Sequence, residues 1–223
     1  MEHRRERSLT ALVILEAIAL FVIAPLSVKT RGAFALEIPV VVAIVACVLA
    51  FVWKNRAAVV AVFLATAIEL AAVCLRFSRP SASTVALDFI AALMLLVALT
   101  VVLGITVFGP GRVTIHRVLG AIAIYLNTAA AFAFAYRIID ALGPDAFTTR
   151  GFGAAGHSIP TFIYFSFAAL TTNGYGDIAP LDPIARSLTN IEAVIGQLYP
   201  ATLLARLITL ELEHRRSARS DRD

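Results

Sequence analysis

The chain has 223 residues, of which 60% are hydrophobic and only 15% are charged, and its mean hydropathy is +0.86. A soluble domain carries about 25% charged residues, so this chain cannot cover a water-facing surface and is expected to be solvated largely by lipid. The same figures exclude a disordered chain, a coiled coil, collagen and a secreted disulfide scaffold. The net charge of +4 is modest and sits at chain ends and loops, which gives no indication of a nucleic-acid partner.

Six apolar stretches are long enough to cross a bilayer, whose core of about 30 Å needs roughly 20 helical residues. They cover approximately residues 8–28, 33–53, 57–75, 84–108, 113–142 and 184–212. We therefore predict an all-α, polytopic membrane protein with six transmembrane helices. A further apolar stretch, Ile159–Leu170, has only twelve residues, too few to span, and predicts a re-entrant or interfacial helix.

Lysine and arginine are distributed unevenly over the loops and tails. If the N-terminus lies inside, eleven of these residues fall on the cytoplasmic side and five outside. Cytoplasmic loops carry the excess of basic residues in membrane proteins, and an even number of spans returns the C-terminus to the starting side. We expect a multi-pass protein of the cell (inner or plasma) membrane with both termini in the cytoplasm.

One helix-breaking run divides the chain. Gly109-Pro110-Gly111-Arg112 lies between the fourth and fifth predicted spans, where glycine and proline interrupt a helix. We expect a four-helix transmembrane block over residues 1–112, a second unit over 113–212 and a charged cytoplasmic tail over 213–223.

A distinctive motif follows the twelve-residue apolar stretch. Residues 171–177 read Thr-Thr-Asn-Gly-Tyr-Gly-Asp, and Pro180 stands three residues after Asp177. The motif resembles the selectivity filter of the tetrameric potassium-channel superfamily, Thr-Val-Gly-Tyr-Gly followed by Asp, in a chain similar to the six-transmembrane, one-pore prokaryotic type. The resemblance covers roughly residues 115–212. It implies that the second unit is a pore domain with an outer helix, a re-entrant pore helix, the filter and an inner helix.

The residue types of the motif fit the chemistry of a desolvated cation. A potassium ion that sheds its water needs equivalent oxygen ligands, and backbone carbonyls from four chains supply them. Consecutive carbonyls face one axis when the backbone alternates between right- and left-handed dihedrals, and glycine adopts the left-handed ones without steric cost. By resemblance the filter consists of Thr172, Asn173, Gly174, Tyr175 and Gly176, and potassium binds through the first four. Potassium is the permeant ligand, and no cofactor is expected.

The pore helix and the filter side chains have expected roles as well. Ser158 is expected to be the N-cap of the pore helix, with Pro160 in its first turn, where proline is tolerated. The C-terminal end of this helix is partially negative and is expected to favour a cation. The side chains of Asn173 and Tyr175 are expected to point away from the pore and to brace the filter.

The outer mouth and the oligomeric state follow from the same resemblance. Asp177 is placed at the outer mouth, where Asp182 and Glu192 are expected to add negative charge. One chain carries one such loop, and a pore needs four, so a homotetramer is implied. The expected partners are other copies of the chain, membrane lipid and potassium ions.

The last predicted span supports the assignment. Gly196 lies twenty residues after Gly176, where the resemblance expects the hinge of the inner helix, and Pro200 predicts a kink. Four residues share one helical face: Gln197, Ala201, Leu204 and Ile208. By resemblance this face lines the cavity, and its two large aliphatic side chains are candidates for a constriction. The alternative is that these two pack on neighbouring helices.

Asn173 departs from the family pattern, which has an aliphatic residue at this position. An unpaired buried amide costs about 1–3 kcal/mol, so a hydrogen bond to the pore helix or to water is expected. A weakly selective monovalent cation channel, caused by Asn173, is therefore one alternative to potassium-selective conduction. A non-conducting membrane scaffold or accessory subunit is a separate one. No hydrolytic triad, metal-ligand spacing or phosphate loop stands in a suitable context, so an enzyme is not expected.

The block of residues 1–112 occupies the position of a voltage sensor but lacks its charges. Arg76 and Arg79 have the three-residue spacing of a sensor, yet they precede Pro80 in a predicted loop, and the fourth predicted span has no Arg or Lys. Each charge that crosses 100 mV contributes about 2.3 kcal/mol, so we expect weak or absent voltage dependence.

The predicted spans also contain acidic residues. Glu16, Glu69 and Asp88 are intramembrane carboxylates, which mark functional sites by default. Because no basic partner is expected in the spans, the simpler interpretation is a neutral or internally hydrogen-bonded group between packed helices. His157 at the outer mouth is expected to be a lone solvated histidine, with pH sensing as the alternative.

Overall fold

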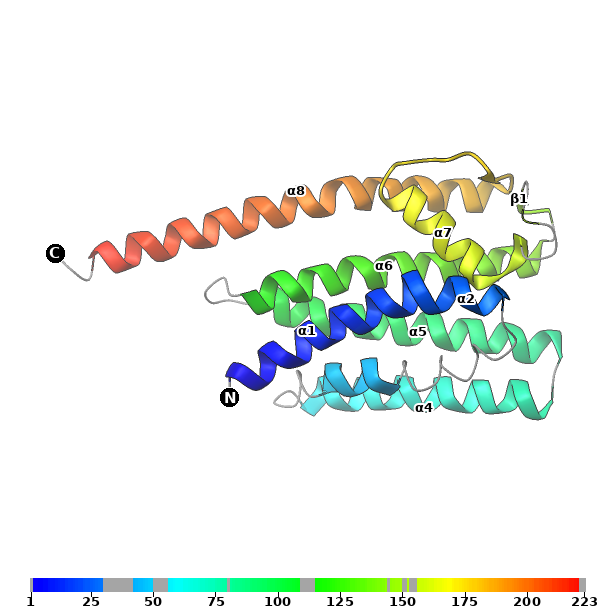
Figure 1. Ribbon diagram of the computed structural model, residues 1–223, viewed down its shortest axis with the longest axis horizontal. Helices are drawn as coiled ribbons and strands as arrows, with labels where there is room; N and C mark the ends of the chain where they lie inside the picture. Colours follow the sequence, from blue (N-terminus) through cyan, green and yellow to red (C-terminus); the bar gives the residue numbers. More distant parts are fainter. Residues whose placement is uncertain are drawn as a thin grey trace.

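A computed structural model of the chain describes residues 2–29, 42–49, 56–79, 81–108, 115–143, 145–149, 152 and 156–220. It shows an elongated bundle of helices with a two-stranded sheet at one end (Figure 1). The elements are α1 (Glu2–Ile18), η1 (Ala19–Ile23), α2 (Ala24–Lys29), α4 (Arg56–Ser78), α5 (Ala82–Val107), α6 (Ile115–Leu142), β1 (Phe147–Thr149), α7 (Ile159–Leu170), β2 (Ile178–Pro180) and α8 (Pro183–Ser220). The start of α1 and the end of α8 lie at the same end of the bundle, away from the sheet (Figure 1).

Four helices of the described part of the chain are long and apolar enough to cross a membrane. Their apolar segments are Leu9–Leu26, Arg56–Ser78, Ser83–Ile105 and Arg117–Leu142. They coincide with the first, third, fourth and fifth predicted spans, which are thereby confirmed as apolar helices. The second predicted span lies mostly outside the described residues, and its described part, 42–49, is helical. The sixth is helical as part of α8, and its membrane crossing stays a prediction.

The N-terminal helical segment extends from α1 to α2, which contacts the short helix α7. After α1 the chain passes through the π-helical turn η1 and into α2 without leaving the helix. α1 packs along α6, and α2 packs on α7. The ring of Phe21 in η1 lies 4.8 Å from that of Phe167 in α7. The N-terminal helix therefore contacts both the outer helix and the short helix of the predicted pore domain.

The predicted domain boundary, residues 109–112, lies outside the described residues. The helices that flank it, α5 and α6, pack closely along each other. One hydrophobic cluster draws on α1, the 42–49 helix, α4, α5 and α6, so the bundle shares one core at this end. The division into a four-helix block and a pore domain stays a prediction.

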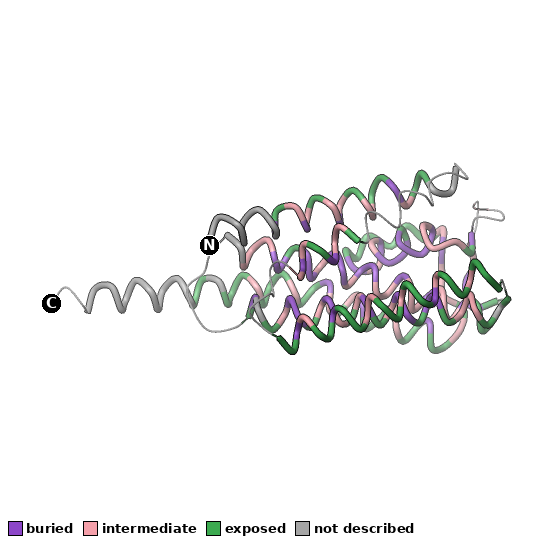
Figure 2. The backbone as a smooth tube through the Cα atoms, turned by 90° about the horizontal axis from the view of Figure 1, so that it is seen from below, coloured by how far each residue is buried: buried purple, intermediate pink, exposed green. Residues whose placement is uncertain are grey.

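A second cluster surrounds α7. It joins α6, β1, β2, α7 and α8 through these buried residues: Ala133, Tyr136, Ala146, Phe147, Phe162, Ile163, Phe165, Ile178 and Ala185. We call it the pore-side cluster. Four of its aromatic rings pack edge to face with centroids 5.0–5.7 Å apart, an arrangement that adds stability beyond the buried area. Buried residues gather along α6 and α7, whereas exposed ones recur along the outer helices (Figure 2).

The small sheet was not expected from the sequence. β1 and β2 are antiparallel, with Phe147 opposite Pro180 and Thr149 opposite Ile178. The N–H of Leu181 also donates to the carbonyl of Ala146 at 2.8 Å. Strands of three residues are too short to show the alternating pattern that predicts a strand, so the otherwise helical fold carries one small exception to the all-α prediction.

The acidic residues of the spans differ in their surroundings. Asp88 accepts a 2.6 Å hydrogen bond from Arg76, and the two form an ion pair. The expectation that no basic partner exists is therefore wrong for Asp88, because α4 extends to Ser78 and carries Arg76 in its last turn rather than in a loop. Glu16 is 3% exposed, and neither of its carboxyl oxygens has a hydrogen-bond partner. A neutral group remains the interpretation for Glu16, since the internal hydrogen bond is absent.

The ion pair between α4 and α5 is testable by a double-mutant cycle. Arg76→Ala leaves the 7% exposed side chain of Asp88 without its counter-charge. We expect a loss of about 2 kcal/mol, below the 3–5 kcal/mol of fully buried pairs because Arg76 is 26% exposed. Adding Asp88→Asn should restore most of the lost stability, measured by thermal unfolding of the purified protein in detergent. A double variant as unstable as Arg76→Ala would contradict this role of the pair.

Candidate functional site

The short helix α7 has the predicted bounds, Ile159–Leu170. Ser158 is its N-cap residue and proline stands in its first turn, as expected. The hydroxyl of Ser158, however, makes no bond to a backbone N–H and instead lies 3.0 Å from the hydroxyl of Thr161. Most of α7 is buried in the pore-side cluster, so this short helix is held by side-chain packing rather than by its cap.

The loop after α7 is hydrogen-bonded to the last turn of the helix. The N–H of Thr172 donates to the carbonyl of Ala169 at 3.0 Å. The N–H groups of Asn173 and Gly174 both donate to the carbonyl of Ala168, at 2.9 and 3.2 Å. The last carbonyls of a helix have no partner inside the helix, and here they determine where the loop begins.

The backbone of this loop is left-handed at every second residue. The φ angles are +58° at Thr172, +54° at Gly174 and +80° at Gly176. The left-handed conformation predicted for the two glycines is confirmed, and no atom lies within 4 Å of a Cβ built at either one. The backbone dihedral, rather than lack of space, therefore requires glycine there.

Thr172 is a left-handed position that the sequence did not reveal. A β-branched residue in this region costs about 1–3 kcal/mol and persists only where the surroundings enforce it. Its N–H is bonded to Ala169, and its hydroxyl accepts a 3.3 Å hydrogen bond from the side-chain amide of Gln197 on α8. Hydrogen bonds therefore fix both the backbone N–H and the side-chain hydroxyl of this strained residue.

The side chain of Tyr175 packs on α7, whereas that of Asn173 is exposed. The ring of Tyr175 stacks on that of Tyr164 with centroids 5.5 Å apart and planes at 10°, as expected for a brace. The hydroxyl of Tyr164 donates to the carboxylate of Asp177 at 2.9 Å. Partial burial and this hydrogen bond raise the pKa of Tyr164 to about 12, so the donor keeps its proton at neutral pH. The side chain of Asn173 is exposed.

The loop lies on the surface of the single chain. Residues 171–176 are all exposed, and so are the apolar side chains of Val194 and Leu198 on the neighbouring α8. Together with Gln197 and Thr172 they line an open groove beside the start of the loop. The loop and the adjoining face of α8 are therefore open in the single chain.

Gly196 permits the closest approach between α8 and α7. A Cβ placed at this position would lie 1.7 Å from the carbonyl oxygen of Leu170, the last residue of α7. The hydroxyl of Tyr125 on α6 donates to the same oxygen at 3.5 Å. The structure thus gives Gly196 a packing role, while the hinge assigned to it by resemblance stays a prediction.

The predicted cavity residues are uncovered in the single chain. α8 continues as a helix through Pro200. Leu204 and Ile208 have exposed fractions of 60% and 53%, so helices of their own chain do not cover them. Their role as a constriction stays a prediction.

Glu192 was assigned wrongly to the outer mouth. It has an exposed fraction of 0% and is hydrogen-bonded to Tyr136 and Ser166, because it faces the interior between α6 and α7. Asp182 caps α8, since its carboxylate accepts from the N–H groups of Ile184 and Ala185 at 2.7 and 3.1 Å. Of the three acidic residues, Asp177 is the one whose carboxylate lies beside the loop, where it accepts a hydrogen bond from Tyr164 on α7.

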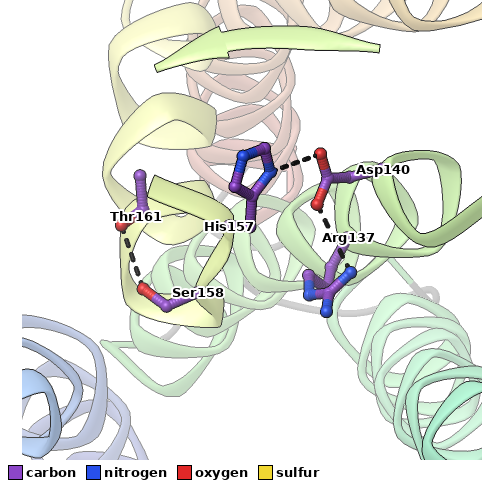
Figure 3. Close-up of polar contacts among 5 residues, drawn as sticks. All are labelled: Arg137, Asp140, His157, Ser158 and Thr161. Atoms are coloured by element: carbon purple, nitrogen blue, oxygen red, sulfur yellow. Dashed lines mark hydrogen bonds and ion pairs between the residues drawn. The ribbon is translucent and has the colours of Figure 1, made fainter. Parts of the chain in front are cut away.

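His157 is exposed, as expected, but it does not stand alone. Its Nδ1 lies 2.8 Å from the carboxylate of Asp140, which is 3% exposed and also lies 3.4 Å from Arg137 (Figure 3). Arg137 in turn stands 4.9 Å over the ring of Phe89 on α5. This contact ties the start of α7 to α6 and α5, and the sequence missed it because Asp140 and His157 are seventeen residues apart.

Comparison with known proteins agrees with this geometry. Residues 118–212 match the family model described as "Ion channel". The match covers less than half of the chain, and within it this segment is similar to an ion channel domain. We call residues 118–212 the channel domain. Protein LctB of Geobacillus stearothermophilus is 34% identical over 80 residues, which cover 34% of this chain and 59% of that protein. No solved structure matches the chain.

The contact at Gly196 is testable with a matched pair of glycine substitutions. Gly196→Ala should push α7 away from α8 and destabilise the channel domain by about 3 kcal/mol, since the clash is with backbone and cannot be relieved by a side chain. Gly104→Ala on α5 meets no atom within 4 Å and should be neutral or slightly stabilising. Thermal unfolding in detergent compares the two. Equal stability of both variants would show that α7 does not approach α8 this closely.

Proposed function

We propose that the chain is one subunit of a homotetrameric, potassium-selective channel of the cell membrane. The observation that carries the proposal is the left-handed backbone at Thr172, Gly174 and Gly176, in a loop that is exposed on the protomer and suspended from the end of α7. Had this loop been buried within one protomer, no shared filter would be possible.

Potassium binding follows from the backbone of the loop. Alternating dihedrals aim successive carbonyls to one side, and four copies around an axis surround a dehydrated cation with oxygens. The ligands in this proposal are the carbonyls of Thr172, Asn173, Gly174 and Tyr175, with the hydroxyl of Thr172 as the innermost oxygen. The side chain of Tyr175 stacks on Tyr164 and so stays out of the proposed ion path.

Charge around the loop favours a cation. The C-terminal end of α7, which carries partial negative charge, leads into the filter. Asp177 follows the filter directly, and the hydrogen bond from Tyr164 holds its carboxylate there. These fixed negative groups support cation rather than anion passage.

Four copies would also cover apolar surface that the single chain leaves open. Ile191, Val194 and Leu198 on α8 are 51–57% exposed beside the loop. Leu204 and Ile208 continue the exposed surface toward the end of α8, and they are the candidate constriction of the cavity. The common location of the start of α1 and the end of α8 supports both termini on the cytoplasmic side (Figure 1).

Voltage has little to act on in this channel. α5, the fourth predicted span, contains no Arg or Lys. Arg76 at the end of α4 is paired with Asp88 and so contributes no free gating charge. We propose weak or absent voltage dependence.

A weakly selective monovalent cation channel is the second candidate, and Asn173 is the observation that favours it. Its amide is exposed in the protomer, and the family that the motif resembles has an aliphatic side chain at this position. A polar, hydrated side chain at this place would loosen the filter and reduce discrimination against sodium. A non-conducting scaffold is the outcome if no flux is found.

Conduction is testable by potassium flux in proteoliposomes. The wild-type protein should support a barium-sensitive flux, and Gly174→Ala should abolish it, because alanine disfavours the left-handed backbone there. Gly104→Ala is the control and should conduct normally. Absence of flux from well-folded wild-type tetramers would support the scaffold instead.

The role of Asn173 is testable by reversal potentials in mixed potassium and sodium. Asn173→Val should increase the potassium-to-sodium permeability ratio by about tenfold, the change expected for roughly 1.4 kcal/mol of differential binding. Asn190→Val on α8, an exposed amide outside the filter, is the matched control and should leave the ratio unchanged. An unchanged ratio in Asn173→Val would mean that this amide does not limit selectivity.

A further inference from the structure

A fully buried carboxyl group joins the three helices of the channel domain. Glu192 on α8, Tyr136 on α6 and Ser166 on α7 all have exposed fractions of 0%. The hydroxyl of Tyr136 donates to Oε2 of Glu192 at 2.5 Å, and a hydrogen bond joins Oε1 of Glu192 to the hydroxyl of Ser166. Ser166 Oγ also donates to the carbonyl oxygen of Ala129 on α6 at 2.7 Å.

The number of hydrogens in this chain of contacts determines the state of Glu192. A serine hydroxyl has one hydrogen to donate, and the bond to Ala129 uses it. The hydrogen between Ser166 and Glu192 then belongs to the carboxyl group, while Tyr136 supplies the hydrogen at the other carboxyl oxygen. Every contact has one donor and one acceptor only when Glu192 is the neutral acid.

The surroundings of Glu192 also favour a neutral group. An ionised carboxylate in an apolar interior is very costly unless it is paired. The titratable groups that face Glu192 are the phenols of Tyr136 and Tyr125, both on α6, and α7 faces it with Ser166. No Lys, Arg or His among the described residues forms an ion pair with it.

We propose that Glu192 is a positioning residue that retains its proton and thereby holds α7, with the filter suspended from it, between α6 and α8. Ser166 lies in α7, less than one turn before the carbonyls of Ala168 and Ala169 that anchor the filter. Removal of the proton from Glu192 takes away the donor to Ser166 and places a charge in the pore-side cluster. Conduction therefore falls as the pH rises through the titration of Glu192. The flux readout of this proposal rests on the proposed function, and its spectroscopic readout does not.

The first experiment measures potassium flux against pH in proteoliposomes containing the full chain. Flux of the wild type should fall on the alkaline side. Glu192→Gln, whose amide donates and accepts like a neutral acid, should conduct within about twofold of wild type at neutral pH and should lack the alkaline fall. Tyr136→Phe removes a phenol but keeps the carboxyl, so it should retain the fall. An alkaline fall that persists in Glu192→Gln overturns the proposal, and one that disappears only in Tyr136→Phe assigns the titration to the phenol.

The second experiment observes the proton directly. The infrared difference spectrum of wild type minus Glu192→Gln should contain a carboxylic-acid C=O stretching band, since a neutral Glu16 contributes equally to both proteins. This difference band should disappear at alkaline pH. A difference spectrum without such a band would show that Glu192 is ionised, which refutes the proposal. If wild type carries no flux at any pH, the proposed function fails while the infrared band still decides the state of Glu192.

Discussion

The backbone of residues 172–176 is the constraint on which the rest of the channel domain depends. Left-handed dihedrals at alternate residues are unfavourable for a β-branched side chain such as Thr172, so the loop needs support from outside itself. The support comes from main-chain hydrogen bonds to the last carbonyls of α7 and from the amide of Gln197. The position of this loop therefore depends on the short helix to which it is bonded.

Each end and each face of α7 is held by a different element. At its start, His157 contacts Asp140 on α6, and at its end the carbonyl of Leu170 rests against Gly196 on α8. Between these points the aromatic rings of the pore-side cluster pack around it, and Ser166 joins it to the buried carboxyl of Glu192. The small sheet joins the segment after this loop to the segment after α6. Helix, loop and strand thus form one braced unit.

The N-terminal helices add a contact that a separate sensor block would not make. η1 and α2 reach α7 through Phe21 and Phe167, and α1 runs along α6. The same block lacks basic residues in α5, and the Arg76 guanidinium is occupied by Asp88. These helices therefore pack against the channel domain through α6 and α7.

The sequence by itself determined the lipid-soluble character of the chain, the bounds of α7 and the two glycines of the loop, because apolar length, a cap with proline and the Gly-Tyr-Gly spacing are local properties. Spacing along one chain could not reveal contacts between residues far apart, so Glu192 was assigned to the outer mouth, His157 was expected to stand alone and Asp88 to lack a partner. Tertiary packing decided these three, since it alone brings Tyr136, Asp140 and Arg76 next to them. It also decided that Thr172 is left-handed, because a β-branched residue adopts that conformation only where its neighbours enforce it.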